Sequence, residues 1–104
     1  MPHSYKNKIT WDENKNVINK AKHGISFETA KLVFHDPWHI SIQDRHENGE
    51  ERWQTLGLIN GFVMLLVAHS IYEENNVEII RIISARKATK QERLCYEQAD
   101  KKTN

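Results

Sequence analysis

The chain has 104 residues, of which 38% are apolar and 28% charged, a composition typical of one globular domain and not of a disordered chain. Its formal net charge of +1 excludes a general polycation, so folding must assemble any surface that binds a polyanion. The single cysteine, Cys95, excludes an intrachain disulfide and a multi-cysteine zinc site.

No segment resembles a targeting or membrane sequence. The longest apolar run, residues 62–68, is far too short to cross a bilayer. The first residues lack the hydrophobic region of a signal peptide. We therefore expect the protein to act in the cytoplasm, with no membrane partner.

Two helices are expected near the N-terminus. Thr10 and Glu13 have the spacing of a capping box, and Gly24 suits the left-handed position after a helix. The apolar positions with roughly helical spacing are Trp11, Val17, Ile18 and Ala21. Ser26 can cap a second helix, which Asp36 and Pro37 should end because a residue before proline avoids the helical region.

Four strands and a final helix are expected next. Residues 38–43 alternate between apolar and polar, and residues 50–59 and 62–72 flank the hairpin dipeptide Asn60-Gly61. Residues 77–86 form a fourth β-branched run, and Thr89 and Glu92 make a second capping box. The predicted fold is α+β, with two N-terminal helices packed on a four-stranded antiparallel sheet and a short C-terminal helix.

The hairpin allows cross-strand neighbours to be predicted. A two-residue turn at Asn60-Gly61 places Arg52 directly opposite His69, with Gln54 on the same face. The fourth strand can join in two registers, because the loop before it is ambiguous. A loop of two or four residues would bring Ser84 and Arg86 beside His69, whereas three residues would bring Arg81 instead.

Residues 81–88 carry the main functional signal. Arg81 lies inside a β-branched run, and Arg86 and Lys87 follow at its end. An Arg within a strand is rare unless it is paired or faces a groove, and a groove with several cations suits a polyanion. Nucleic acid is therefore the first partner that the sequence predicts.

Structural interpretations of the same residues stay open. His69 can be a hydrogen-bonded histidine at a strand end, and Arg86 and Lys87 can be solvated loop cations. Lys22 can simply match the negative end of a helix dipole. Tyr96 can act as an acid or belong to the core.

Several sequence motifs of known enzyme classes are absent, which limits the reactions that the protein can be expected to catalyse. The sequence has no Walker loop, no Gly-rich dinucleotide motif, no HExxH zinc motif and no GxSxG elbow. Metal-free acid–base chemistry or plain binding remains, and neither a metal nor another cofactor is expected.

From about Ile9 to Glu97 the chain resembles the BrnT family, the toxin half of bacterial type II toxin–antitoxin pairs. The segments that carry the resemblance are 11–12, 14–15, 22–24, Phe27 with Ala30, 36–37, 49–52, Gly57, His69, 81–88, 92–93 and 96–97. The resemblance implies a RelE-like fold, a ribonuclease activity that blocks translation, and a BrnA-like antitoxin with a ribbon-helix-helix DNA-binding part. Operator DNA would be bound only through that antitoxin. We expect a domain over residues 9–98, an N-terminal extension over 1–8 and a tail over 99–104.

The function predicted from the sequence is a metal-independent endoribonuclease that uses the 2′-hydroxyl of RNA as its nucleophile. His69 and Glu50 are the candidates for proton transfer. The candidates for charge stabilisation are Arg52, Arg81 and Arg86, because guanidinium groups fit phosphate oxygens. Lys87, Lys22 and Gln54 would bind flanking RNA. Two alternatives remain: a non-catalytic RNA- or ribosome-binding module, and a protein that mainly binds its antitoxin.

Overall fold

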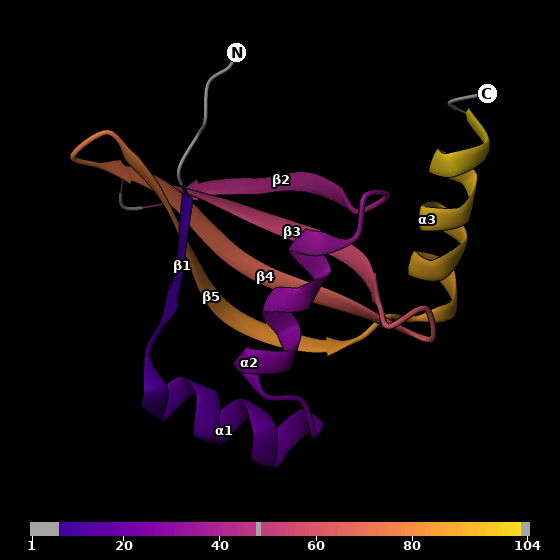
Figure 1. The fold of residues 1–104 in the computed structure, drawn as a ribbon, viewed down its shortest axis with the longest axis horizontal. Helices are drawn as coiled ribbons and strands as arrows, with labels where there is room; N and C mark the ends of the chain where they lie inside the picture. The colour runs from indigo at the N-terminus through magenta and orange to yellow at the C-terminus, as the bar shows by residue number, and fades with distance from the viewer. Residues whose placement is uncertain (1–6, 48, 103–104) are drawn as a thin grey trace.

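The computed structural model describes residues 7–47 and 49–102. A five-stranded sheet with the order β1-β5-β4-β3-β2 forms its centre, and the helices lie on the sheet and at its end (Figure 1). The strands are β1 (Asn7–Trp11), β2 (Ile40–Glu47), β3 (Glu50–Ile59), β4 (Val63–Glu74) and β5 (Val77–Lys87). The helices are α1 (Glu13–His23), α2 (Phe27–Ala30), the 3₁₀ helix η1 (Lys31–His35) and α3 (Lys90–Lys102).

The predicted four-stranded antiparallel sheet is wrong. A fifth strand, β1, precedes the first helix and pairs in parallel with β5, from Asn7 opposite Glu78 to Trp11 opposite Ile82. Only five residues long, it shows no clear alternation, and the sequence interpretation divided it between an extension and a helix start. The second predicted helix is also shorter, because α2 has four residues and continues as η1.

Most of the predicted helix-capping residues are confirmed, and one predicted cap is wrong. Gly24 adopts a left-handed conformation with φ 74°, and the Ser26 hydroxyl accepts from the Thr29 N–H. Thr89 and Glu92 form the reciprocal capping box at α3. The first helix is capped by Asp12, whose carboxylate accepts from the amides of Asn14 and Lys15. The predicted cap, Thr10, lies within β1.

The inner side of α1 is polar, contrary to the predicted apolar stripe. Asn16 and Asn19 are buried, whereas Val17 is 62% exposed and Ile18 is 63% exposed. The Asn19 amide donates to the carbonyl oxygens of Ile25 and Ala85 and accepts from the Ala85 N–H. An asparagine side chain thus bonds the β5 backbone beyond the point where β1 ends.

The main core lies between the sheet and the segment α2–η1. Its fully buried members include Phe27, Ala30, Val33, Leu65 and Val67. β3 approaches η1 at Gly57, where an added Cβ would lie 2.7 Å from the Cβ of Val33. A smaller cluster of Leu56, Met64 and Leu66 lies against Ala88 and Tyr96, so α3 packs at one end of the opposite sheet face.

The register of the β3–β4 hairpin differs from the prediction by one residue. Asn60 and Gly61 do form the tight turn, both with positive φ, and the Phe62 N–H donates to the Ile59 carbonyl. Phe62 is then an extra residue, because the ladder resumes with Ile59 opposite Val63. Since one residue of slip moves every side chain to the other face, Arg52 lies opposite Ser70 and His69 lies opposite Trp53.

The turn before β5 has two residues, but it does not bring Ser84 and Arg86 beside His69 as predicted, because a bulge in β5 puts them on the opposite face. Asn75 and Asn76 form a two-residue turn with positive φ, and Ser70 then pairs with Arg81. The register shifts between Ala68 and His69, so that Ile83 is the extra residue. Arg81 and Arg86 are five residues apart and would face opposite sides of a regular strand, but the bulge puts both on one face.

The predicted domain limits fall inside secondary structure. β1 begins at Asn7, within the predicted extension 1–8, and α3 continues to Lys102, within the predicted tail 99–104. Residues 1–6 and 103–104 lie outside the described residues. Of the helices in the described ranges, none has the length and apolar character needed to cross a membrane.

Candidate active site on the arginine face

Polar and charged side chains gather on the sheet face opposite α2 and η1. We call this surface the arginine face. By strand register it comprises Arg45, Glu50, Arg52, Gln54, Ser70, Tyr72, Arg81, Ser84 and Arg86. Three of the predicted arginines, Arg52, Arg81 and Arg86, are therefore brought together with the predicted Glu50 and Gln54.

One row of residues crosses four strands at the centre of this face. Arg45 pairs with Arg52, Arg52 with Ser70, and Ser70 with Arg81. Because neighbouring strands lie about 4.8 Å apart, the backbones of Arg52 and Arg81 are separated by roughly 10 Å across Ser70. Ser70 is fully buried, and its hydroxyl has no hydrogen-bond partner among the described residues. The row can present several guanidinium groups to one phosphodiester and its neighbours.

Glu50 and Arg81 form a close charge pair on this face. The Arg81 Nη2 donates to the Glu50 Oε1 at 2.6 Å, and the side chains are 41% and 23% exposed. The Arg81 guanidinium also lies 5.6 Å from the centre of the Tyr72 ring. A carboxylate, a guanidinium and a phenol therefore occupy one small area, which supplies both proton-transfer groups and positive charge.

Arg86 is held differently. Its Nη1 and Nη2 donate to the two carboxylate oxygens of Glu92, each at 2.9 Å. The hydrogen bond from Arg86 lowers the pKa of Glu92 to about 2, against some opposition from burial, and raises the pKa of Arg86. This bidentate pair fastens the end of β5 to α3 and leaves Arg86 at the rim of the arginine face.

We expect Glu92→Gln to lower the free energy of unfolding by about 1 kcal/mol at pH 7, because the partly exposed ion pair is lost. The folded pKa of Glu92 is about 2 against 4.5 ordinarily, so its contribution is complete above pH 4.5 and disappears as the pH falls toward 2. Urea denaturation of variant and wild type between pH 2 and 7 measures this. Glu97→Gln on the exposed side of α3 is the control, and a deficit that is constant with pH would contradict the prediction.

Asp36 holds the middle of α3, where Tyr96 lies. The Tyr96 hydroxyl donates to its Oδ2 at 2.7 Å, and the amides of Leu58 and Trp38 donate to the same carboxylate. Burial acts to raise the pKa of Asp36, but these hydrogen bonds outweigh it and hold the pKa below its usual value. Of the two interpretations of Tyr96, the structure supports the packing role.

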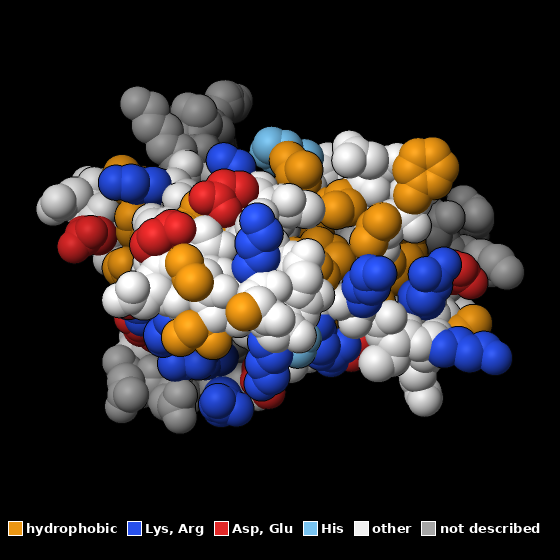
Figure 2. Space-filling model, turned by 90° about the horizontal axis from the view of Figure 1, so that it is seen from below, with side chains coloured by type: hydrophobic (Ala, Val, Ile, Leu, Met, Phe, Trp, Pro, Cys, Tyr) orange, Lys and Arg blue, Asp and Glu red, His pale blue; other side chains and the backbone are white. Residues whose placement is uncertain are grey.

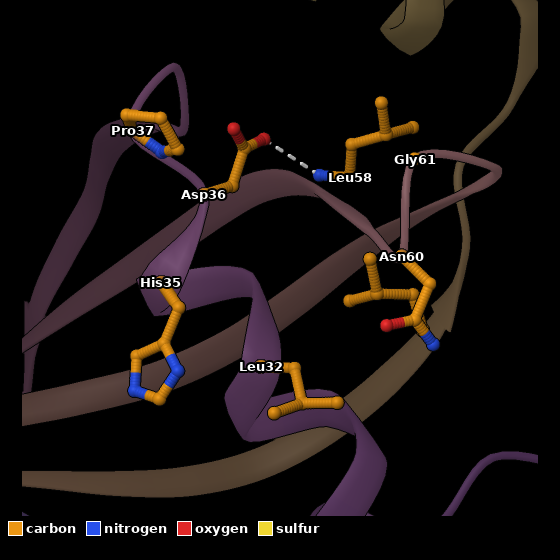
Figure 3. A pocket seen from close by; sticks show the side chains of 8 residues that line it. Leu32, His35, Asp36, Pro37, Leu58, Asn60 and Gly61 are labelled. Atoms are coloured by element: carbon orange, nitrogen blue, oxygen red, sulfur yellow. Dashed lines mark hydrogen bonds between the residues drawn. The ribbon is translucent and has the colours of Figure 1, made fainter.

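A hollow of about 390 Å³ lies between η1 and the β3–β4 turn (Figure 3). Its lining includes Leu32, His35, Asp36 and Asn60. In Figure 3 the Asp36 carboxylate points to the Leu58 amide, so its capacity is already used by the fold. None of the arginines of the arginine face lines this hollow.

His69 lies on the helix side of the sheet, and the predicted pairing with Arg52 is wrong. It is 1% exposed, its Nε2 is 2.7 Å from the Thr55 hydroxyl, and its ring packs edge-to-face on Phe34 at 5.0 Å. Burial lowers the pKa of His69 to about 4, so the imidazole is neutral at physiological pH. This geometry favours the structural interpretation of His69 as a hydrogen-bonded histidine, and it places that histidine in the core.

The predicted RNA-binding lysines lie outside the arginine face. Lys22 is on α1 and lines a hollow together with Ile83 and Ser84, at the edge of the face. Lys87 pairs with the core residue Leu65 and therefore lies on the helix side of β5, where it is exposed. In the described part of the chain no group of three His, Cys, Asp or Glu side chains is placed to hold a metal ion.

The comparisons with known proteins agree with this architecture. A family model described as "Ribonuclease toxin, BrnT, of type II toxin-antitoxin system" matches residues 11–92. The chain belongs to the BrnT family. Among solved structures, the Brucella abortus ribonuclease toxin BrnT is similar with a TM-score of 0.61 and 24% identity, over 84% of this chain and 100% of that chain. A search of curated proteins found no match.

Membership in the BrnT family makes the arginine face a candidate site for RNA. The family is one of ribonuclease toxins in type II toxin–antitoxin systems, so an antitoxin partner is implied. Three residues of the arginine face escaped the sequence analysis: Arg45, Ser70 and Tyr72. A bulge between Gln43 and Arg45 and the extra residue Phe62 bring them onto this face.

Proposed function

We propose that this BrnT-family protein is an endoribonuclease that cleaves RNA without a metal ion, using the 2′-hydroxyl of the substrate as nucleophile. One observation carries the proposal. The bulge at Ile83 places Arg81 and Arg86 on the same sheet face as Arg52, with Glu50 bonded to Arg81. Guanidinium groups beside a carboxylate match the needs of this reaction, which are charge stabilisation and proton transfer.

The proposed reaction assigns the chemistry to three kinds of group. Glu50 accepts the proton of the 2′-hydroxyl, whose oxygen then attacks the adjacent phosphorus. Arg52 and Arg81 stabilise the additional negative charge on the pentacoordinate phosphate. The bond from phosphorus to the 5′ oxygen breaks, and the Tyr72 hydroxyl is our candidate for protonating that oxygen. A 2′,3′-cyclic phosphate and a free 5′-hydroxyl result.

The remaining residues are proposed to bind the strand on either side. Gln54 lies two residues from Arg52 on the same strand and face, where it can hydrogen-bond a base or a sugar. Arg86 at the rim and Lys22 beside Ser84 can hold neighbouring phosphates. Lys87 extends the positive charge at the end of β5. His69 has no part in this site, because it faces the opposite side of the sheet.

The antitoxin partner is proposed to be BrnA-like, with a ribbon-helix-helix part through which the complex binds operator DNA. We further propose that the toxin acts in the cytoplasm, where it would cut RNA and block translation. A non-catalytic RNA- or ribosome-binding module is the alternative, since the same arginine face would bind phosphates without a competent acid–base pair.

Purified protein freed of antitoxin should cut RNA in excess EDTA, because the substrate supplies the nucleophile and the arginines supply the positive charge. The fragments should end in a 2′,3′-cyclic phosphate or a 3′-phosphate. Mass spectrometry of cleaved oligonucleotides, with and without EDTA, measures both features. Cleavage that needs a divalent ion, or fragments with a 5′-phosphate, would contradict the proposed metal-free attack by the 2′-hydroxyl. Growth arrest without any cleavage would favour the binding module.

A further inference from the structure

The orientation of α1 is the reverse of that of an ordinary surface helix. Its inward side carries Asn16 and Asn19, which are 5% and 6% exposed. At 100° per residue, Val17, Ile18 and Ala21 lie on the opposite side of the helix, and all three are exposed. An amphipathic surface helix normally turns such an apolar stripe toward the core.

Hydrogen bonds fix this orientation. The Asn16 carbonyl oxygen accepts from the Phe27 amide at 2.8 Å, and its amide group donates to Glu28 at 3.0 Å. Asn19 makes three bonds to the backbone of Ile25 and Ala85. A rotation that buried Val17 and Ile18 would break this network, so residues 7–47 and 49–102 leave the apolar stripe uncovered.

Lysines border the apolar stripe on both sides. Lys15 and Lys22 lie one helical turn before and after Ile18 on one side, and Lys20 lies on the other. A hollow of about 180 Å³ on the first side has Lys15, Ile18 and Lys22 in its lining. One of about 250 Å³ on the second side is lined by Val17 and Lys20 and also by the acids Glu13 and Glu28. Figure 2, seen from below, shows hydrophobic and basic side chains, with some acidic ones among them, on the end of the molecule where α1 lies.

We infer that this surface, the α1 outer face formed by Val17, Ile18, Ala21, Lys15, Lys20 and Lys22, is where the antitoxin docks. The occupant that it fits is an amphipathic antitoxin helix, with apolar residues for the Val17–Ile18 ridge and acidic residues for the flanking lysines. Charge complementarity supports this choice. No acid is among the residues that line the hollow on the Lys15 and Lys22 side, and the two acids on the Lys20 side, Glu13 and Glu28, are both already bonded to Asn16. The inference deepens the proposed function, since it names the surface through which the toxin is neutralised.

The test separates toxicity from neutralisation. Val17→Glu and Ile18→Glu are to be expressed alone and together with the antitoxin, taken as the product of the gene beside that of this chain. Both variants should arrest growth like the wild type, because neither Val17 nor Ile18 is among the residues proposed to bind or cut RNA. Neither should be rescued by the antitoxin, and the purified variants should bind it at least about tenfold more weakly. Phe62→Glu, at an apolar residue that is 82% exposed elsewhere, should be rescued normally.

Every other outcome decides against one of the two proposals. Rescue of both variants, with unchanged binding, would overturn the docking surface and leave the ribonuclease proposal intact. If the wild type neither arrests growth nor cuts RNA, the proposed function is wrong. The docking surface is then still tested by the binding of the variants to the purified antitoxin. Should either glutamate variant fail to fold, the exposed double variant Lys15→Glu/Lys20→Glu replaces it, with the same expectation.

Two other occupants of the α1 outer face have distinct signatures. If a second copy covered it, light scattering of the protein alone would show a dimer that Val17→Glu converts to a monomer. If an anionic bilayer covered it, the protein would float with phosphatidylglycerol vesicles and Ile18→Glu would abolish flotation. Either result, combined with normal binding of the antitoxin by the variants, would replace the antitoxin as the occupant.

Discussion

Arg52→Ala and Arg81→Ala should each reduce the rate of RNA cleavage by about 10²–10³, the usual cost of removing one group that stabilises transition-state charge. The two side chains flank Ser70 in one cross-strand row, so both can reach the same phosphate. Single-turnover cleavage of an oligonucleotide at saturating enzyme measures the chemical step. Because groups that act as a unit are not additive, the double variant should be much less than a million-fold slower.

Stability must be measured on the same proteins. Each arginine is partly exposed, and removing it should change the free energy of unfolding by no more than about 1 kcal/mol. Arg93→Ala, on the exposed side of α3, is the matched control and should cut RNA at the wild-type rate. Full activity of both Arg52→Ala and Arg81→Ala would place the active site elsewhere. Loss of activity that merely follows unfolding would mean that the arginines are structural.

The contrast with His69 shows how much rests on one residue of register. The Asn60-Gly61 signal correctly predicted the turn, but no rule of turn chemistry revealed that Phe62 would be an extra residue. Because of this one extra residue, His69 lies in the core, where it contacts Thr55 and Phe34, and not on the face of Arg52 as predicted. Replacing His69 with alanine is therefore expected to act through stability.

The sequence selected Arg52, Arg81 and Arg86 by residue type, and the register puts all three on one sheet face, in an arrangement that differs from the predicted one. An Arg inside the β-branched run of β5 was a reliable signal, because such a charge needs a partner or a groove. Because side chains alternate between the two faces of a regular strand, only one of Arg81 and Arg86 was expected on the arginine face. The bulge at Ile83 puts both of them there. Bulges depend on packing between distant segments, so the alternation of apolar and polar residues does not predict them. Here the Ala85 N–H, two residues after the bulge, donates to the side chain of Asn19 on α1.

The helices show a different limit of sequence interpretation. End signals such as Gly24, Ser26 and Thr89 depend on local geometry, and the structure confirms them. The buried side of α1 was predicted from hydrophobicity, and here hydrogen bonds of Asn16 and Asn19 override it. β1 was missed because a five-residue edge strand is stabilised mainly by its partner β5.

Glu50→Gln is expected to reduce cleavage by about 10²–10⁴, the range for loss of a group that transfers a proton in the transition state. Glutamine keeps the size of the side chain and can still accept from the Arg81 guanidinium, which now lies 2.6 Å from the Glu50 carboxylate. The substitution therefore removes basicity while the arginine stays in place. RNA binding should stay within a few-fold of wild type or become tighter, because a negative charge is removed from the arginine face.

The pH dependence of the Glu50→Gln variant separates the two roles open to Glu50. As a general base it contributes an ascending acid limb to the rate of the wild type, and this limb should be absent from the residual activity of the variant. If Glu50 only positions Arg81, the variant should keep the shape of the wild-type profile and lose rate uniformly. Glu78→Gln, at an exposed acid on β5, is the control and should leave both the rate and the profile unchanged. An ascending limb that persists at full height in Glu50→Gln would assign the base to another group.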